Sequence, residues 1–190
     1  MKKPFNDVPL AELVPKQLSE DGKSLDLRLK YIGDEGLKSL AGDETLRGLE
    51  VLNLERNDIS LEGIRALAES QVITGLVELH LERNDIGDEG VRLIAESSNF
   101  SKLKYLNLWK NKVGSAGAGS LAQSLYLSGL VKLDLAQNSI GDEGARALSE
   151  SLTLSDLAYI DVFGNGISPE GQELLKKAEG LGKVQELILA

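Results

Sequence analysis

The sequence contains no cysteine and only one histidine, and aromatic residues make up 4% of its 190 residues. Without cysteine there are no disulfide bonds, no thiol nucleophile and no zinc site built on thiolates. A long hydrophobic run is also absent near the start, where Asn6, Asp7 and Glu12 follow the basic residues 1–4. The sequence therefore predicts neither a cleaved signal peptide nor a membrane-spanning segment, and we expect a cytoplasmic protein or one that is exported without a cleaved signal.

An excess of positive charge is missing as well. The chain has 21 lysines and arginines against 30 aspartates and glutamates, which gives a net charge of −9. Proteins that bind nucleic acids normally present a basic face, and anionic membrane surfaces attract basic segments. The charge balance therefore disfavours both kinds of partner and leaves another protein as the expected one.

The chain instead has a repeat with a constant period of 27 residues. Each copy opens with a segment such as Val77–Glu82, in which apolar and polar residues alternate as they do in a half-buried strand. Consecutive copies at a fixed period in the twenties are typical of a solenoid. An asparagine follows this segment in five copies, at Asn57, Asn84, Asn111, Asn138 and Asn165. The six full copies span about residues 22–48, 49–75, 76–102, 103–129, 130–156 and 157–183.

A helix is expected in the second half of each copy. The leucines of the strand would point into the core, and an apolar residue such as Ile86 would fill it two residues after the asparagine. The helix would start at a short polar residue, as at Asp88 or Ser168, whose side chain accepts hydrogen bonds from free amides of the first turn. A glycine near each helix start, such as Gly90, indicates close packing of the backbone.

The two ends of the chain depart from the repeat. Residues 1–21 do not match it, but Leu13 and Val14 belong to a helical pattern, and we expect an N-terminal helical cap over the first end of the core. A partial seventh copy supplies a last strand at Leu187–Leu189. Its outer edge would be open, which indicates either a longer parent protein or edge pairing with another chain. The predicted domains are the cap at 1–21 and the repeat domain at 22–190.

The pattern LxxLxLxxNxIxxxGxxxLA, which covers nearly the whole chain, resembles leucine-rich repeats of the ribonuclease-inhibitor-like subtype. The runs at Gly63–Leu67 and Gly144–Leu148 also resemble bacterial GALA-type repeats. The resemblance implies an α/β horseshoe with parallel strands on the concave face, helices on the convex face, and binding as its usual task. Some GALA-type proteins carry an F-box before the repeats; since only about 21 residues precede them here, we do not carry over a role as a ubiquitin-ligase adaptor.

The best candidates for function are outward residues of the predicted strands. Four aromatic residues occupy such positions although folding does not require them there, and exposed aromatic residues on a rigid surface are typical of binding hot spots. Trp109 lies near the middle of the array and is the expected centre of the site. Neighbouring strands are about 4.8 Å apart, so nearby charged residues would join the same patch. The predicted partner-binding residues are Trp109, Tyr105, Phe163, Tyr159, His80, Glu82, Arg56, Arg83, Lys110, Lys132, Asp134 and Asp161.

Other motifs predict structure rather than chemistry. The recurring asparagines share one repeat position and are expected to bond the backbone in turns. The segment Gly114–Ser120 imitates a phosphate-binding loop, but it lacks the Gly-Lys-Ser/Thr sequence of such loops. A lone histidine, His80, with exposed glutamates nearby is a weak metal-ligand set. We do not expect an open surface to shift the pKa values of Asp134 and Asp161 enough for acid–base catalysis. No catalytic residue, metal or cofactor is predicted.

The sequence therefore favours a non-enzymatic protein–protein interaction module, such as a bacterial regulator or effector. A first alternative is a catalytic activator, because the repeat subtype resembles that of activating proteins for a nuclear-transport GTPase; the uniform, short loops of this chain offer no outlying residue for that role. A second alternative is a structural spacer within a longer repeat array. The uncharged segment Ala116–Gln123 is a further candidate contact on the convex face.

Overall fold

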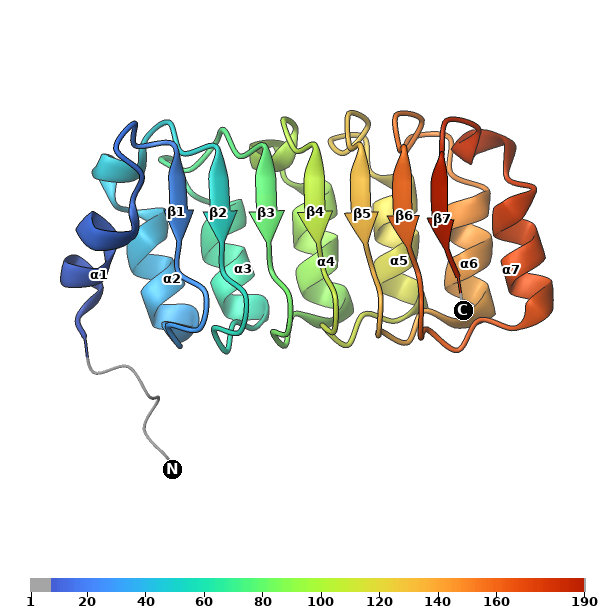
Figure 1. The fold of residues 1–190 in the computed structure, drawn as a ribbon, viewed down its shortest axis with the longest axis horizontal. Helices are drawn as coiled ribbons and strands as arrows, with labels where there is room; N and C mark the ends of the chain where they lie inside the picture. Colours follow the sequence, from blue (N-terminus) through green and yellow to red (C-terminus); the bar gives the residue numbers. More distant parts are fainter. Residues whose placement is uncertain (1–7, 190) are drawn as a thin grey trace, which may run out of the picture.

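The computed structural model describes residues 8–189, which form one layer of strands backed by one layer of helices (Figure 1). Seven parallel strands lie in a single open sheet in the order of the sequence. The strands are β1 (Ser24–Asp26), β2 (Val51–Asn53), β3 (Glu78–His80), β4 (Tyr105–Asn107), β5 (Lys132–Asp134), β6 (Tyr159–Asp161) and β7 (Glu186–Ile188). The helices are α1 (Leu10–Gln17), α2 (Gly33–Ala41), α3 (Leu61–Ala68), α4 (Gly87–Glu96), α5 (Ser115–Gln123), α6 (Gly141–Ser149) and α7 (Pro169–Lys176), with short 3-10 helices η1 (Glu44–Leu46), η2 (Ser98–Phe100) and η3 (Glu179–Leu181).

The register of the sheet advances by one repeat from each strand to the next. Leu52 pairs with Leu79, and Leu79 pairs with Leu106. All three leucines are fully buried, and they share one continuous core with the inward residues of the helices. Because register and repeat coincide, every inward position stacks on its equivalent in the next unit. The predicted α/β solenoid is therefore confirmed.

The recurring asparagines are buried and connect neighbouring units. The side-chain Oδ1 of Asn84 accepts hydrogen bonds from the amides of Asn57 and Ile59, both at 3.0 Å. Its Nδ2 donates to the carbonyls of Leu54 and Leu81, both at 2.9 Å. These side chains take the place of backbone partners in the turns after the strands. The structural interpretation of the asparagines is confirmed.

The starts of α2, α4 and α6 differ from those of α3, α5 and α7, and the sequence interpretation missed this alternation. Asp88 was expected to cap its own helix, but α4 has no side-chain cap, and neither do α2 and α6, which carry Asp34 and Asp142 at the same position. Instead, Oδ1 of Asp34 accepts hydrogen bonds from the amides of Ser60, at 2.8 Å, and Gly63, at 3.0 Å, at the start of the next helix. The expectation was wrong because the equivalent carboxylate of each such unit reaches its neighbour across the stack.

This contact between units explains one of the repeated glycines. A Cβ added at Gly63 would lie 2.6 Å from Oδ1 of Asp34 and 3.0 Å from Cγ2 of Ile59. Heavy atoms of neighbouring residues do not approach so closely without a shift of the structure. The predicted close packing of the backbone at the helix starts is therefore confirmed at this position.

The two ends differ in how the core is covered. Helix α1 carries Leu13 and Val14, which are 7% and 5% exposed, into the common core, in agreement with the helical pattern read from the sequence. At the other end β7 pairs with β6, and Leu187 is only partly buried. No helix within residues 8–189 is both long and apolar enough to cross a membrane.

Candidate protein-binding surface

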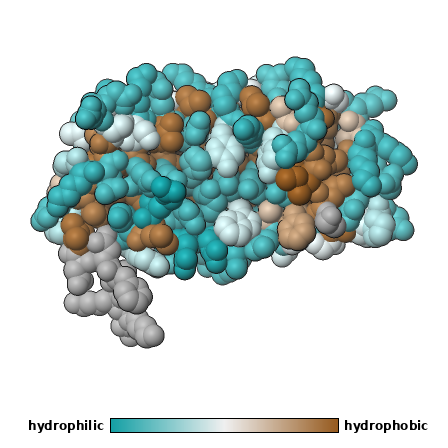
Figure 2. All heavy atoms as spheres, in the orientation of Figure 1, coloured by the Kyte–Doolittle hydropathy of each residue, from teal (hydrophilic) through white to brown (hydrophobic). Residues whose placement is uncertain are grey.

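The outward residues of the strands form rows across the strand face, which we define as the side of the sheet opposite the helices. Hydrophilic residues cover much of the middle of this face, and hydrophobic residues gather toward β6 and β7 (Figure 2). The first row contains Ser24, Val51, Glu78, Tyr105, Lys132, Tyr159 and Glu186. The second contains Asp26, Asn53, His80, Asn107, Asp134, Asp161 and Ile188. The third, just beyond the strands, contains Arg28, Glu55, Glu82, Trp109, Ala136 and Phe163.

The rows bring together the residues that the sequence singled out. Tyr105, His80 and Trp109 stand in three successive rows: Tyr105 on β4, His80 on β3 and Trp109 just beyond β4. The aromatic residues differ in exposure: Phe163 is 47% exposed, whereas Trp109 is half-buried. The remaining three candidates, Arg56, Arg83 and Lys110, follow the third row directly, in the turns after β2, β3 and β4.

An ionic cluster around His80 occupies the middle of the strand face. Its Nε2 lies 3.4 Å from Oε2 of Glu78, and its Nδ1 lies 3.5 Å from Oε1 of Glu82. The imidazole also meets the ring of Tyr105 edge-on, with the centroids 4.7 Å apart. Burial alone would lower the pKa of His80, but Glu82 and Glu78 outweigh it and raise the pKa above its ordinary value of 6.5. Oε2 of Glu82 is buried and has no hydrogen-bond partner within residues 8–189.

Trp109 lies next to this cluster and is partly covered. The guanidinium carbon of Arg83 lies 5.0 Å from the centroid of the indole ring. This distance is within the range of a cation–π interaction, which is attractive because the face of the ring is electron-rich. The indole is therefore held in place by a neighbouring unit and still keeps part of its surface open to solvent.

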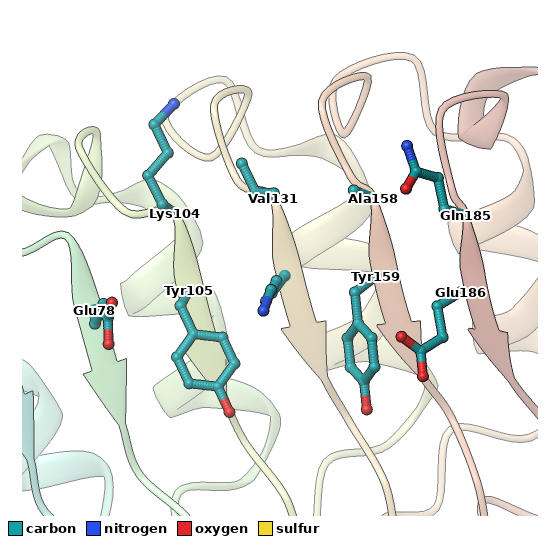
Figure 3. Close-up of a pocket in the computed structure, with 9 residues that line it drawn as sticks. Glu78, Lys104, Tyr105, Val131, Ala158, Tyr159, Gln185 and Glu186 are labelled. Atoms are coloured by element: carbon teal, nitrogen blue, oxygen red, sulfur yellow. The ribbon is translucent and has the colours of Figure 1, made fainter.

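Two tyrosines border a groove in the first row. Tyr105 and Tyr159 stand on either side of β5, and Lys132 comes from that strand between them (Figure 3). The groove has a volume of about 710 Å³, and its lining extends from Glu78 on β3 to Glu186 on β7. Burial and the nearby carboxylates raise the pKa of Tyr159 to about 12. Its phenol is therefore neutral and able to donate a hydrogen bond at physiological pH.

In the second row, Asp134 lies next to another carboxylate, that of Asp161. Burial raises the pKa of Asp134, and the charge of neighbouring Asp161 raises it further. The sequence interpretation did not expect an open surface to shift the pKa of Asp134 enough for acid–base catalysis; its pKa is raised because the side chain is half-buried among other acids. Both carboxylates also accept backbone amides: Oδ1 of Asp134 binds the amide of Ala136 at 2.9 Å, and Oδ1 of Asp161 binds that of Phe163 at 2.8 Å.

A second groove, of about 560 Å³, lies where the chain turns away from the strands. We call it the basic groove, because four of its lining residues are cations and only one is an acid, Asp58. The cations are Arg56, Arg83, Lys110 and Lys112. All four have a positive φ between 52° and 60°, which residues other than glycine rarely adopt. The backbone therefore fixes these residues in an uncommon turn conformation.

A family model described as "Leucine Rich repeat" matches residues 47–68, 74–95, 101–122 and 130–149, which fall on four successive strand–helix units. The chain is a leucine-rich repeat protein. No curated protein matches this leucine-rich repeat chain.

Several solved structures are similar to part of this chain at low sequence identity. An internalin (inlF) from Listeria monocytogenes is 20% identical with a TM-score of 0.44, and the match covers 80% of this chain and 50% of that one. A TDR receptor is 16% identical with a TM-score of 0.41 and coverages of 80% and 28%. The ectodomain of the plant membrane receptor kinase GASSHO1/SCHENGEN3 from Arabidopsis thaliana, in complex with CASPARIAN STRIP INTEGRITY FACTOR 2, is 16% identical with a TM-score of 0.38 and coverages of 80% and 19%. The leucine-rich repeat chain thus spans half or less of each of these proteins.

The segment that imitates a phosphate loop serves the repeat architecture. The amides of Gly114 and Gly117 both donate to the carboxylate of Asp88 in the preceding unit. An anion would need these same amides, and a carboxylate already uses them. Within residues 8–189 no group of three or more histidine, aspartate and glutamate residues is arranged to hold a metal ion.

Two exposed leucines on this leucine-rich repeat protein escaped the sequence interpretation. Leu125 is 80% exposed and Leu152 is 86% exposed, in the loops after α5 and α6. Tyr126, at 42%, is exposed beside the first of them. The signal was present in the sequence, because the same repeat position is polar in other units. Those polar residues are Glu44, Gln71, Ser98 and Glu179.

Proposed function

We propose that this leucine-rich repeat protein is a non-enzymatic interaction module that binds a protein partner on its strand face, with Trp109 at the centre of the contact. Leucine-rich repeat domains generally mediate protein–protein interactions. The observation that supports this location is the open, half-buried indole of Trp109, which the core does not need and which Arg83 orients. Ordered aromatic side chains of this kind contribute most of the binding energy at many interfaces.

The surroundings of Trp109 support the same proposal. Along β4 and the turn that follows, Trp109 comes between Tyr105, which borders the groove of the first row, and Lys110, which borders the basic groove. A partner that covers Trp109 could therefore also fill the two grooves that lie on either side of Trp109. The mixture of cations, carboxylates and phenols in the two grooves favours a protein partner, whose surface carries all the complementary groups.

The proposal also includes the repeat subtype, the class of partner and the place of action. A helix in each of the first six strand units supports the ribonuclease-inhibitor-like subtype. The net charge of −9 supports a protein partner over nucleic acid or an anionic membrane. We extend the proposal to a regulator or effector of bacterial origin with GALA-like repeats, acting in the cytoplasm or after export without a cleaved signal.

Affinity capture from a native lysate tests the proposed function. The wild-type protein is compared with Trp109→Ala and with Arg92→Ala, which changes an exposed side chain on the opposite surface. We expect a protein that is retained by the wild type and by Arg92→Ala and is lost with Trp109→Ala. Retention by Trp109→Ala together with loss from Arg92→Ala would place the partner on the helix side and contradict the proposal. Circular dichroism of the three proteins checks that each one is folded.

A further inference from the structure

Positive charge is concentrated in one place on an otherwise acidic protein. The chain has a net charge of −9, yet the turn residue after each of β2, β3 and β4 is basic. These residues are Arg56, Arg83 and Lys110, and the same position holds Leu29 in the unit before them and Gln137 in the unit after. Three successive cations in equivalent positions form a straight row of charge across three units.

The backbone holds this row rigidly. The amides of Arg56, Arg83 and Lys110 donate to carbonyls of the following units at 2.9, 2.8 and 2.9 Å. All three residues share the same turn conformation, with φ of 52°, 57° and 56°. Since neighbouring strands are about 4.8 Å apart, the row extends over about 10 Å. A ligand that binds it meets side chains that start from fixed, equivalent backbone positions, which lowers the entropic cost of binding.

The cations of the basic groove are only partly neutralised within the protein. Nζ of Lys112 lies 2.8 Å from Oδ2 of Asp85, and Arg83 stacks on Trp109. Arg56 and Lys110 take part in no ion pair within residues 8–189. The groove therefore offers excess positive charge next to the residue proposed as the centre of the interface.

We propose that the basic groove seats an acidic segment of the protein partner, in which consecutive aspartates or glutamates cross the units of β2, β3 and β4. This inference rests on the proposed function and names the chemistry of the partner. Arginine and lysine bind carboxylates by charge-assisted hydrogen bonds. An extended segment rises about 3.3 Å per residue, so three or four residues span the row. Cations spread along a line suit several single charges, whereas one phosphate group would require them to converge on a point.

The single tryptophan of the chain makes the test direct, because Trp109 is its only source of indole fluorescence and lies beside the groove. The wild-type protein is titrated with a short polyglutamate peptide, with polyglutamine of the same length, and with inorganic phosphate. We expect polyglutamate to change the emission of Trp109 in a saturable way, with an affinity that falls several-fold as salt increases. Equal responses to polyglutamate and polyglutamine would overturn the proposal, as would a response to phosphate without one to polyglutamate.

Charge-reversal variants locate the binding. Arg56→Glu/Lys110→Glu should reduce polyglutamate affinity at least tenfold, and the matched variant Lys38→Glu/Lys102→Glu, at exposed lysines outside both grooves, should change it less than threefold. An equal loss in both variants would mean that overall charge, not the basic groove, binds the peptide, and would overturn the proposal. Both double variants change the net charge by the same amount, so they are compared at the same ionic strength.

The same variants separate this inference from the proposed function. If Arg56→Glu/Lys110→Glu keeps the captured partner and Trp109→Ala loses it, the acidic-segment inference fails and the proposed function stands. If polyglutamate binds through the groove but Trp109→Ala keeps the partner, the proposed function fails and the groove remains a site for acidic segments. Calorimetry replaces fluorescence for Trp109→Ala, which has no indole.

Discussion

The unit that contains β3 and α4 has two surfaces on which the charged side chains are paired differently. On α4, Arg92 closes a local network, with its guanidinium 2.9 Å from Glu89 and 2.6 Å from Glu96. On the strand face of the same unit, His80 lies between two carboxylates, and Glu82 keeps a buried oxygen without a partner within residues 8–189. Exposed pairs like those of Arg92 contribute little beyond a solvated surface.

This difference indicates that the strand face, rather than α4, is the surface suited to binding a partner. The charges on α4 satisfy one another in water and gain little from a partner. The strand face holds half-buried groups that are incompletely paired, such as Asp134 with its raised pKa and the stacked pair of Arg83 and Trp109. A partner that excludes water would strengthen interactions of this kind. The following predictions test whether the two surfaces differ as described.

The largest effect is expected from the buried asparagines, which connect neighbouring units beneath both surfaces. Asn84→Ala removes two accepted and three donated hydrogen bonds and should lower the free energy of unfolding by about 3 kcal/mol, because it leaves buried backbone groups unpaired. The matched control is Asn111→Ala: Oδ1 of Asn111 has no partner within residues 8–189, so the loss should be clearly smaller. Urea unfolding measures both. An equal or larger loss for Asn111→Ala would contradict this account of the asparagines.

A smaller effect is expected at the helix starts. Asp88→Ala removes the acceptor of two amides at the start of α5, those of Gly114 and Gly117. The N-cap Gly114 has no side chain to replace it, so the change should cost about 1 to 2 kcal/mol. Asp142→Ala is the control, because α7 keeps the side chain of Ser168 as a cap, and its cost should be lower. Thermal or urea unfolding of both variants measures the two stability losses. A larger loss for Asp142→Ala than for Asp88→Ala would show that the caps between units do not determine these losses.

The His80 cluster should make stability depend on pH. The folded pKa of His80 is raised, so its contribution to stability is fully present below the unfolded value of 6.5 and is lost as pH rises through the folded pKa. Between about pH 5.5 and about pH 8.5, wild type should therefore lose more stability than His80→Gln. Asp134, whose pKa is raised above 3.8, is present in both proteins, so its titration does not account for a difference between their profiles. Parallel pH profiles for the two proteins would show that the glutamates do not stabilise protonated His80.

The smallest effect is expected on α4. Arg92→Ala breaks two exposed ion pairs and should change the free energy of unfolding by no more than about 0.5 kcal/mol. A urea titration at low and at high salt measures this change. A loss above about 1 kcal/mol would remove the contrast between the two surfaces, because the network on α4 would then be a structural one.

The sequence was sufficient for the fold because the repeat is so regular. A constant period makes Leu52, Leu79 and Leu106 equivalent, so one correctly interpreted strand fixes the positions of the others. The same argument places Tyr105, Lys132 and Tyr159 in one row across the strand face. Both predictions need only the register, which the period determines.

Interactions between units could not be predicted in the same way. The carboxylate of Asp34 caps the next helix rather than its own, and this depends on the three-dimensional stack rather than on local sequence. The stacking of Arg83 on Trp109 depends on side-chain conformations, and the raised pKa of Asp134 depends on burial among other acids. Periodicity carries no information on these quantities.

The measurement that tests the central claim most directly is the binding free energy of the captured partner, determined by calorimetry with wild type, Trp109→Ala and Arg92→Ala. If the strand face is the binding surface, Trp109→Ala should lose about 2 kcal/mol or more, about a thirtyfold loss of affinity, and Arg92→Ala should bind like wild type. Unchanged affinity for Trp109→Ala in a folded protein would contradict the claim that this partner binds on the strand face around Trp109.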